Sequence, residues 1–214
     1  IAPNLKKVSK ERIQTELTKL LLSDFPEKLS MAEETGISPY VTEDFREIFQ
    51  SGMDFGALAR LPKEKSMRWA GCLRCLAPET AGKILKGLKL DNETITNGRV
   101  MIEAYQSPLR ADKVEIRRFL SRMTRYQFGG CLYLKELDGD LRVKEIRGLW
   151  GEIEESGDCV SLKTLAVGGN DLLEAGIRPG KEVGEILKSL LELVLEDPSM
   201  NKKEILLNFV QSAR

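Results

Sequence analysis

The stretch that decides the fold runs from Val167 to Pro198 and reads VGGNDLLEAGIRPGKEVGEILKSLLELVLEDP. From Gly180 onward its apolar residues recur at gaps of three and one, which places them on one face of a helix. This apolar stripe consists of Val183, Ile186, Leu187, Leu190, Leu191, Val194 and Leu195. Because the polar residues fall on the opposite face and Pro198 cannot continue a helix, the pattern predicts one long helix that packs through its stripe.

A basic corner, Gly176 to Lys181, precedes this helix. Pro179 suits a position just before a first turn, and Gly180 lets the backbone approach a ligand closely. Arg178 and Lys181 add two cations where unpaired amide N–H groups already favour an anion. The corner is therefore a candidate phosphate site, and an ordinary surface helix start is the alternative.

Shorter helical patterns, separated by breakers and caps, fill the rest of the chain. Helices are expected after the cap Ser9 to residue 22, over 26–35, after Thr42 to 49, and over 54–60, 64–76, 78–88, 92–105, 112–123, 126–137, 140–155 and 201–210. Asn201 and Glu204 have capping-box spacing for the last of these. Since no segment alternates with period two between hairpin turns, we predict an all-α protein, an array of short helices followed by a helical tail.

Burial of large apolar side chains must hold such short helices together. We expect Trp69 and Trp150 to contribute most. The helix over 140–155 should turn five apolar residues inward: Leu141, Ile146, Leu149, Trp150 and Ile153.

The charges of the 214 residues cancel, with 33 basic against 33 acidic side chains, but they are unevenly spread. Residues 60–90 carry eight Lys or Arg against two Glu, a net of +6, and residues 108–126 carry six against two, a net of +4. A basic middle could follow a phosphate backbone, and solvated helix faces would have the same composition. No apolar run approaches the roughly 20 residues of a membrane span, and no signal peptide is recognisable.

The chain has no histidine, which excludes His-based acid–base catalysis, Ser-His-Asp triads and His-ligated metal sites. The chain has four cysteines: Cys72, Cys75, Cys131 and Cys159. Cys72 and Cys75 form a C-x-x-C, but no second C-x-x-C completes a zinc site. We therefore expect buried, reduced thiols in a cytoplasmic protein. Asp138-Gly-Asp140 has the spacing of a metal-binding pair, but it lies between two expected helices and is interpreted as a turn and helix cap.

Two distant segments resemble one family. Residues 8–21, VSKERIQTELTKLL, resemble the Ser-x-Glu-Arg-Ile-x-x-Glu-Leu-x-Lys-Leu-Leu motif in the neck of class II tRNA nucleotidyltransferases, which are the bacterial CCA-adding enzymes and their poly(A) polymerase relatives. Residues 169–180, followed by the long helix, Asn201 and Glu204, resemble that family's tail. Met67-Arg-Trp-Ala-Gly-Cys-Leu73 resembles its body. The resemblance is weak over residues 44–61 and 99–139.

The resemblance implies three parts: neck helices over 1–36, a helical RNA-binding body over 37–157 and a tail over 158–214. It also implies a missing part, because the family's chemistry lies in an N-terminal head that binds magnesium and ATP or CTP. No head motif precedes Ser9, and the chain begins with Ile, so we expect a portion of a longer protein. We therefore predict no catalytic residue, metal or cofactor in this chain and no nucleotide addition by it alone.

A departure from some relatives is informative. Those relatives carry His-Asp after the apolar body motif, as metal-dependent phosphohydrolases do, whereas this chain has Arg74-Cys75 there. The sequence therefore excludes a metal phosphohydrolase.

The resulting hypothesis is that the chain positions tRNA, through its phosphate backbone, for addition of the 3′-terminal CCA by the head. The candidate RNA-binding residues are Arg178, Lys181, Lys202, Lys203, Arg117, Arg118, Arg122 and Arg125, the last four expected to line a groove on one helix. The resemblance gives Ser9, Glu11, Arg12 and Glu16 a supporting role for the nucleotide-templating turn of the head. The alternative is an exposed helix face with an Arg12–Glu16 pair.

Two other functions stay open. One is a poly(A) polymerase, or an enzyme that adds only A or only CC, because the head decides this choice. The other is a helical protein-interaction module without an RNA role, in which the tail helices form a homodimer or partner surface.

Overall fold

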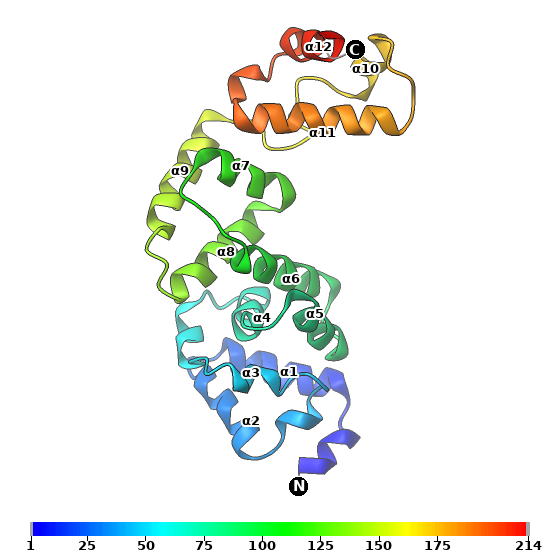
Figure 1. Ribbon diagram of the computed structural model, residues 1–214. Coiled ribbons are helices and arrows are strands. Elements are labelled where there is room, and N and C mark those ends of the chain that lie inside the picture. The colour runs from blue at the N-terminus through cyan, green and yellow to red at the C-terminus, as the bar shows by residue number, and fades with distance from the viewer. Residues whose placement is uncertain (1, 213–214) are drawn as a thin grey trace. The chain divides into compact units, whose positions relative to one another are not determined.

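The computed structural model describes residues 2–212, in which helices and turns occur but no β-strand (Figure 1). The predicted all-α fold is confirmed. The chain forms two compact units, the first from residues up to 108 together with 125–141, and the second from 109–124 together with the residues from 142 onward. The predicted division at residues 36 and 157 stays a prediction. No helix in residues 2–212 combines the length and apolar content that a membrane span needs.

The described residues of the first unit form seven α-helices joined by short turns. They are α1 (Lys10–Leu22), α2 (Met31–Glu34), α3 (Glu47–Gln50), α4 (Lys65–Leu73), α5 (Pro78–Gly87), α6 (Asn92–Gln106) and α8 (Arg125–Leu137). Short stretches of 3-10 helix span Ala2–Lys7, Pro26–Ser30, Ser38–Tyr40 and Gly56–Arg60. Helix α4 packs against α1 and α6, and α6 also contacts α5 and α8, as the middle of Figure 1 shows.

Arg68 fastens the end of α1 to the core of this unit. Its side chain is 1% exposed, and its guanidinium donates hydrogen bonds to the carbonyl oxygens of Leu21 (2.9 Å), Ser23 (3.4 Å), Ala59 (3.2 Å) and Pro62 (3.1 Å). The last carbonyls of a helix have no partner within the helix. Arg68 therefore satisfies the end of α1 and holds the following chain in place, while burial lowers the pKa of its guanidinium.

Trp69, the next residue of the body motif, is fully buried against α1. Its indole N–H donates to the Thr18 hydroxyl at 3.0 Å, and that hydroxyl also accepts from the Gln14 amide at 3.0 Å. A buried tryptophan needs such a partner for its N–H group. The contact fixes the rotation of α1 against α4.

Gly71 allows the close packing around α4. A Cβ atom at this position would meet Leu61 and would lie 2.9 Å from the Leu58 Cδ2 atom. Gly130 in α8 has the same role, since a Cβ there would lie 2.6 Å from the Met101 Sδ atom of α6. These glycines serve packing and not a special backbone conformation.

The second unit contains five α-helices among its described residues. They are α7 (Lys113–Arg122), α9 (Val143–Ser156), α10 (Gly169–Glu174), α11 (Lys181–Glu196) and α12 (Lys203–Ser212), with a 3-10 turn over Pro198–Met200. Leu190 and Val194 of the α11 stripe are buried in one cluster. The cluster also contains Val167 before α10, Leu172 in α10 and Leu206 in α12. The long amphipathic helix predicted after Gly180 is confirmed, with Gly180 as its N-cap.

Two predicted helix caps are wrong. Thr42 begins no helix, because α3 starts at Glu47 and residues 43–46 form turns. Asn201 does not cap α12. Its side chain instead accepts from the Ala166 amide (2.8 Å) and donates to the Thr164 carbonyl (3.1 Å), which holds the loop before α10. A short polar side chain can bind any nearby backbone group, so capping-box spacing alone does not select the helix.

Three burial predictions also need correction. Leu141 is 93% exposed because α9 begins only at Val143, and Val143 takes the inward position. Trp150 is only partly buried and donates its indole N–H to the Glu154 carboxylate at 3.0 Å. Cys75 is exposed, whereas the other three cysteines are buried, and all four are free thiols. Cys75 follows the end of α4, beyond the helix that buries Cys72.

We predict that Arg68→Met destabilises the first unit by about 3–5 kcal/mol, because several carbonyl oxygens lose their donor inside the core. The measurement is urea unfolding in a Trp150→Phe background, in which the fluorescence of Trp69 reports on this unit. The control is Arg46→Met, an exposed arginine that pairs with Glu33 at 2.8 Å, and it should leave the midpoint nearly unchanged. Equal midpoints for the two variants would refute the role of Arg68.

We predict that Gly71→Ala costs about 1–3 kcal/mol through overpacking against Leu58 and Leu61. Adding Leu61→Ala should then destabilise less than it does in the parent chain, because the new methyl group fills part of the cavity. Gly82→Ala in α5 is the control, since its Cβ would lie at an ordinary 3.6 Å from the Arg99 Cδ atom. That change should be neutral or stabilise by up to about 1 kcal/mol. Urea unfolding followed by Trp69 fluorescence measures the stability change of all these variants.

Candidate nucleic-acid interface

The four motif residues at the start of α1 are surface groups with local partners. The Ser9 hydroxyl accepts from the Arg12 amide at 3.4 Å and caps the helix, as the sequence predicts. The Glu11 carboxylate pairs with Lys89 at 2.7 Å, which lowers the pKa of Glu11. Glu16 pairs with Lys19 at 2.9 Å, so the expected Arg12–Glu16 pair is wrong. Arg12 is exposed and forms no ion pair with the carboxylates of residues 2–212.

The basic corner before α11 lies at the surface. Gly180 has a φ of 137°, a conformation that suits glycine, and it brings the backbone directly into the first turn of α11. Arg178 is exposed and forms no ion pair within the described part of the chain. Lys181 is 92% exposed at its side chain and contacts Glu185 at 3.2 Å, one turn later. The corner therefore presents one free and one loosely paired cation.

Of the two lysines at the start of α12, Lys203 is paired and Lys202 is not. Lys203 pairs with Asp171, the residue whose carboxylate also accepts from the Gly168 amide at 2.7 Å. This contact lowers the pKa of Asp171 and raises that of Lys203. Lys202 is exposed, and no carboxylate of residues 2–212 pairs with it.

Arg117 belongs to the core of the second unit. Its side chain is 6% exposed and donates to the Leu195 carbonyl (2.7 Å), the Glu196 carbonyl (3.2 Å) and the Asp158 carboxylate (2.8 Å). It thereby binds the C-terminal end of α11, which attracts cations. A guanidinium held in this way is not available to RNA.

The four arginines of the central basic segment do not share one helix, so the expected groove is wrong. Helix α7 ends at Arg122, and Arg125 is the first residue of α8 in the other unit. Arg118 pairs with Glu192 (3.1 Å) and Glu196 (2.7 Å) of α11, which raises its pKa. Arg122 is exposed and has no ion pair within residues 2–212.

Three exposed cations on neighbouring helices of the first unit were not predicted from the sequence. Lys83 and Lys86 lie on α5, and Arg99 lies on α6, which packs against α5. A Cβ atom at Gly82 of α5 would lie 3.6 Å from the Arg99 Cδ atom. The Arg99 side chain therefore lies beside α5, the helix that carries the two lysines. No carboxylate of residues 2–212 pairs with these three cations. The net charge of residues 60–90 was the available signal, but it could not separate these cations from paired ones.

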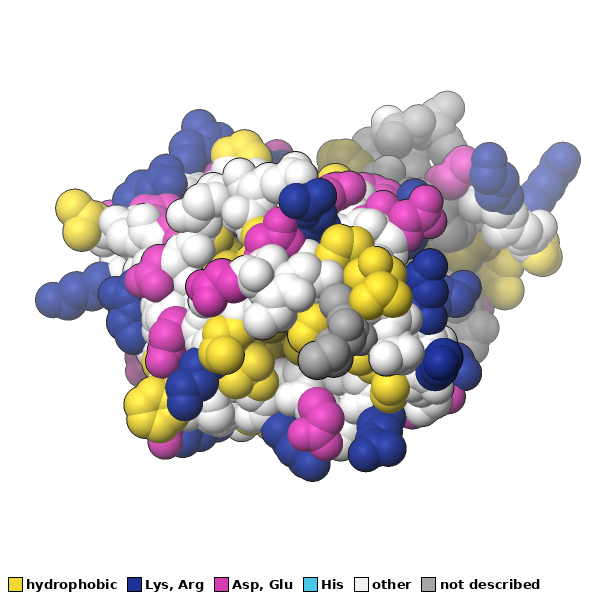
Figure 2. Space-filling model, turned by 90° about the horizontal axis from the view of Figure 1, so that it is seen from below, with side chains coloured by type: hydrophobic (Ala, Val, Ile, Leu, Met, Phe, Trp, Pro, Cys, Tyr) yellow, Lys and Arg dark blue, Asp and Glu magenta, His cyan; other side chains and the backbone are white. Residues whose placement is uncertain are grey.

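Several other cations of the first unit form ion pairs with nearby carboxylates. Figure 2, the view from below Figure 1, shows Lys and Arg side chains interspersed with Asp and Glu. The pairs Arg46–Glu33 (2.8 Å) and Lys63–Asp24 (2.6 Å) are examples. Because a paired cation has its field largely cancelled, Lys83, Lys86 and Arg99 stand out as groups that could hold phosphate.

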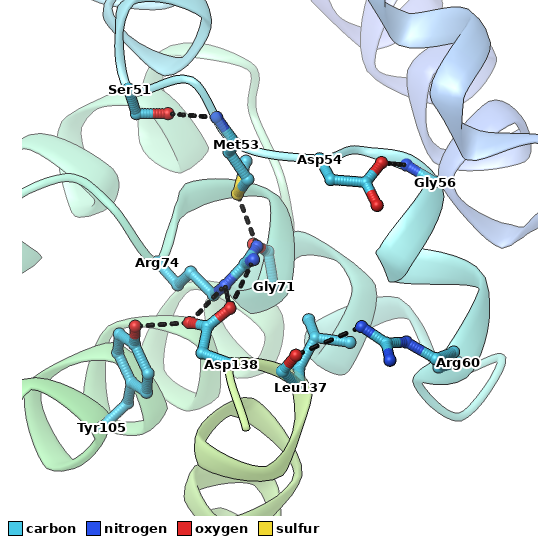
Figure 3. Close-up of polar contacts among 10 residues, drawn as sticks. All are labelled: Ser51, Met53, Asp54, Gly56, Arg60, Gly71, Arg74, Tyr105, Leu137 and Asp138. Atoms are coloured by element: carbon cyan, nitrogen blue, oxygen red, sulfur yellow. Dashed lines mark hydrogen bonds and ion pairs between the residues drawn. The ribbon is translucent and has the colours of Figure 1, made fainter. Parts of the chain in front are cut away.

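A network of hydrogen bonds joins the buried Arg74 to the Asp138 side chain, which is 38% exposed, and to the half-buried Tyr105. Arg74 is 7% exposed at its side chain and binds the Asp138 carboxylate through two nitrogens, at 2.9 and 3.1 Å, while the Tyr105 hydroxyl donates to the same carboxylate at 2.6 Å (Figure 3). Burial and the Asp138 charge raise the pKa of Tyr105 to about 12. Arg74 and Tyr105 keep the pKa of Asp138 lowered although burial opposes this.

This network explains the turn after α8. Asp138-Gly139 forms the predicted turn, with Gly139 at a φ of 81°, and the Asp138 carboxylate accepts hydrogen bonds from Arg74 and Tyr105. The predicted helix cap at this turn is wrong, because α9 begins at Val143 with Arg142 in the N-cap position. Within residues 2–212 no three His, Cys, Asp or Glu side chains gather in a geometry that could hold a metal ion.

Comparison with known proteins gives one consistent result. A family model described as tRNA nucleotidyltransferase domain 2, putative, matches residues 61–210, and one described as the probable RNA- and SrmB-binding site of polymerase A matches residues 1–49. CCA-adding enzymes of Enterococcus faecalis and Streptococcus mutans are each 25% identical to the chain, over 99% and 98% of its length. The chain spans about half the length of these relatives, 52% of each.

The fold is also shared with a solved structure, that of the Bacillus stearothermophilus CCA-adding enzyme in complex with CTP. The TM-score is 0.79 at 20% sequence identity, and the match covers 99% of this chain and 54% of the other. Since the first family model covers most of the chain, from the end of the 3-10 turn before α4 into α12, the chain belongs to the tRNA nucleotidyltransferase family.

Proposed function

We propose that the chain is the RNA-binding C-terminal portion of a tRNA nucleotidyltransferase that positions tRNA while a head domain outside this chain adds the 3′-terminal CCA. The similarity to CCA-adding enzymes over 98–99% of the chain carries this proposal. The head would supply the catalytic carboxylates, magnesium and the ATP and CTP sites. The chain alone should therefore add no nucleotide.

The cations of the surface support a binding role. Positions that contact every tRNA must hold phosphates without reading bases, which requires exposed Lys or Arg whose charge is not already neutralised. Within the described residues, the exposed Lys and Arg side chains without a carboxylate partner are Lys6, Lys7, Arg12, Lys28, Arg60, Lys83, Lys86, Arg99, Arg122, Lys144, Lys163, Arg178, Lys188 and Lys202. Of the residues predicted from sequence, Arg122, Arg178 and Lys202 stay in the proposed interface. Arg117 leaves it because it is buried.

Poly(A) addition is the second candidate, because the match over residues 1–49 is to an RNA-binding segment of polymerase A. The choice between CCA and poly(A) would lie in the head. A homodimer through the tail helices and a cytoplasmic location complete the proposal, and sedimentation of the chain with and without tRNA tests the former.

We predict that the 214-residue chain binds bulk tRNA with an affinity that falls steeply as salt rises, and that the triple change Lys83→Gln, Lys86→Gln and Arg99→Gln weakens binding. The slope of log Kobs against log salt should become shallower by about one for each phosphate that is no longer neutralised. Filter binding from low to moderate salt measures both quantities.

The matched control is the triple change Lys19→Gln, Arg46→Gln and Lys63→Gln. These three cations are also exposed, but they pair with Glu16, Glu33 and Asp24, so the total charge changes equally without removal of a free cation. Equal weakening by the two triple variants would contradict the proposed surface. Binding that does not respond to salt would contradict phosphate recognition altogether.

A further inference from the structure

Arg60 is an exposed arginine with most of its hydrogen-bonding capacity unused. Its guanidinium donates to the Leu137 carbonyl at 3.2 Å, as the right side of Figure 3 shows, and forms no ion pair within residues 2–212. A guanidinium has five N–H donors. Since one is engaged, Arg60 can still offer a two-pronged set of donors to an anion.

The nearby Asp138 forms no ion pair with Arg60, although the charge of Arg60 contributes to the lowered pKa of Asp138. Both oxygens of its carboxylate already accept hydrogen bonds from Arg74, and one also accepts from Tyr105. Figure 3 shows the Asp138 side chain turned toward these two partners, with Arg60 on the other side of Leu137. Asp138 is therefore bound to Arg74 and Tyr105, and most N–H donors of Arg60 remain available for a ligand.

Two hollows meet at Arg60, and both lie in the first unit. One, of about 370 Å³, is lined by the loop Ser51 to Asp54, by Ala57, Arg60, Cys75 and Leu137, and by the three residues of the network, Arg74, Tyr105 and Asp138. The other, of about 360 Å³, is lined by Leu61, Tyr133 and Glu136, and again by Arg60 and Leu137. Each volume falls within the roughly 300–1,000 Å³ of small-molecule sites. Arg60 thus stands between two spaces that are large enough for a ligand group.

The lining of the second hollow matches a nucleotide. Tyr133 is 37% exposed, which leaves ring surface for a base to stack on. Carboxylates stand on either side, Glu136 in one hollow and Asp54 in the other, and they can accept hydrogen bonds from base N–H groups. A simple anion would find these carboxylates repulsive, whereas a nucleotide joins a phosphate to an aromatic base that carries N–H donors.

We propose that these two hollows form a binding site for one unpaired nucleotide, with its phosphate on Arg60 and its base against Tyr133. The proposal deepens the proposed function, on which it rests for the source of the nucleotide, an unpaired residue of a bound RNA. A free nucleoside monophosphate has the same chemistry and is the other source.

The experiment is a titration of the whole 214-residue chain with AMP, CMP, GMP and UMP, followed by NMR shifts of backbone amides. Amides around Arg60 and Tyr133 should shift with one common dissociation constant. The monophosphates of A, C and G should bind more tightly than UMP, whose base lacks an amino group. Arg60→Gln should weaken binding about ten- to a hundredfold, since a charge-assisted hydrogen bond is removed while an amide donor remains for Leu137.

Two variants at Tyr133 distinguish base stacking from a general packing effect. Tyr133→Leu should weaken binding at least about fivefold, and Tyr133→Phe, which keeps the ring, should retain it. Arg46→Gln, a paired arginine of the same unit, is the control and should bind like the parent chain. Binding of inorganic phosphate alone as tight as that of AMP, or equal affinities in Arg60→Gln and the parent, would overturn the site.

An RNA hairpin with an unpaired 3′ tail and the same hairpin with a blunt end distinguish the two sources. If the nucleotide comes from RNA, Arg60→Gln should weaken binding of the tailed hairpin only. If AMP binds but the tail adds no affinity, the site takes free nucleotides. Loss of tRNA binding in the Lys83, Lys86 and Arg99 variant leaves this result unaffected, so the two proposals fail separately.

Discussion

Buried cations at the ends of helices organise both units of this protein. Arg68 binds carbonyls at the end of α1, Lys135 binds the Tyr105 and Ser107 carbonyls (2.7 and 2.9 Å) at the end of α6, and Arg117 binds those at the end of α11. The free carbonyls of a helix C-terminus carry partial negative charge, which a buried Lys or Arg can neutralise without a carboxylate. In a fold of short helices with many ends, this contact decides which helices meet.

The same constraint explains why the distribution of charge along the sequence is a poor map of the surface. Residues 60–90 have a net charge of +6, yet Arg68 and Arg74 are buried, and Lys63, Lys65 and Lys89 pair with carboxylates. Lys83, Lys86 and Arg60 remain from this segment. Only the cations that are neither buried nor paired with a carboxylate can bind a phosphate. The three-dimensional structure is needed to identify them.

The Arg74–Asp138–Tyr105 network shows a related use of charge. Arg74 follows the end of α4, and the Asp138 carboxylate, from the turn after α8, accepts hydrogen bonds from two of its nitrogens. The network ties α4, α6 and the end of α8 together in the first unit, and it leaves the neighbouring Arg60 without a carboxylate partner. The Arg74–Asp138 ion pair therefore both joins the helices and leaves Arg60 unpaired.

The sequence by itself determined the helices, because their signals are local. Ser9, Pro78 and Asp112 stand at helix starts, Gly36 and Gly157 follow helix ends with positive φ, and the α11 stripe predicts its buried face. It also determined the family, through motifs whose residues Arg68 and Trp69 serve packing. Caps by Thr42 and Asn201 were wrong because a short polar side chain can serve several backbone groups.

Only the tertiary structure decided which charged side chains are free. Arg117 and Arg122 belong to the same helix and look alike in sequence, yet one lies against the end of α11 and the other faces solvent. Arg60 likewise depends on Leu137 and Asp138, which follow it by more than 70 residues. The energy of a charge depends on what lies within a few ångströms of it, and distance along the chain does not report that.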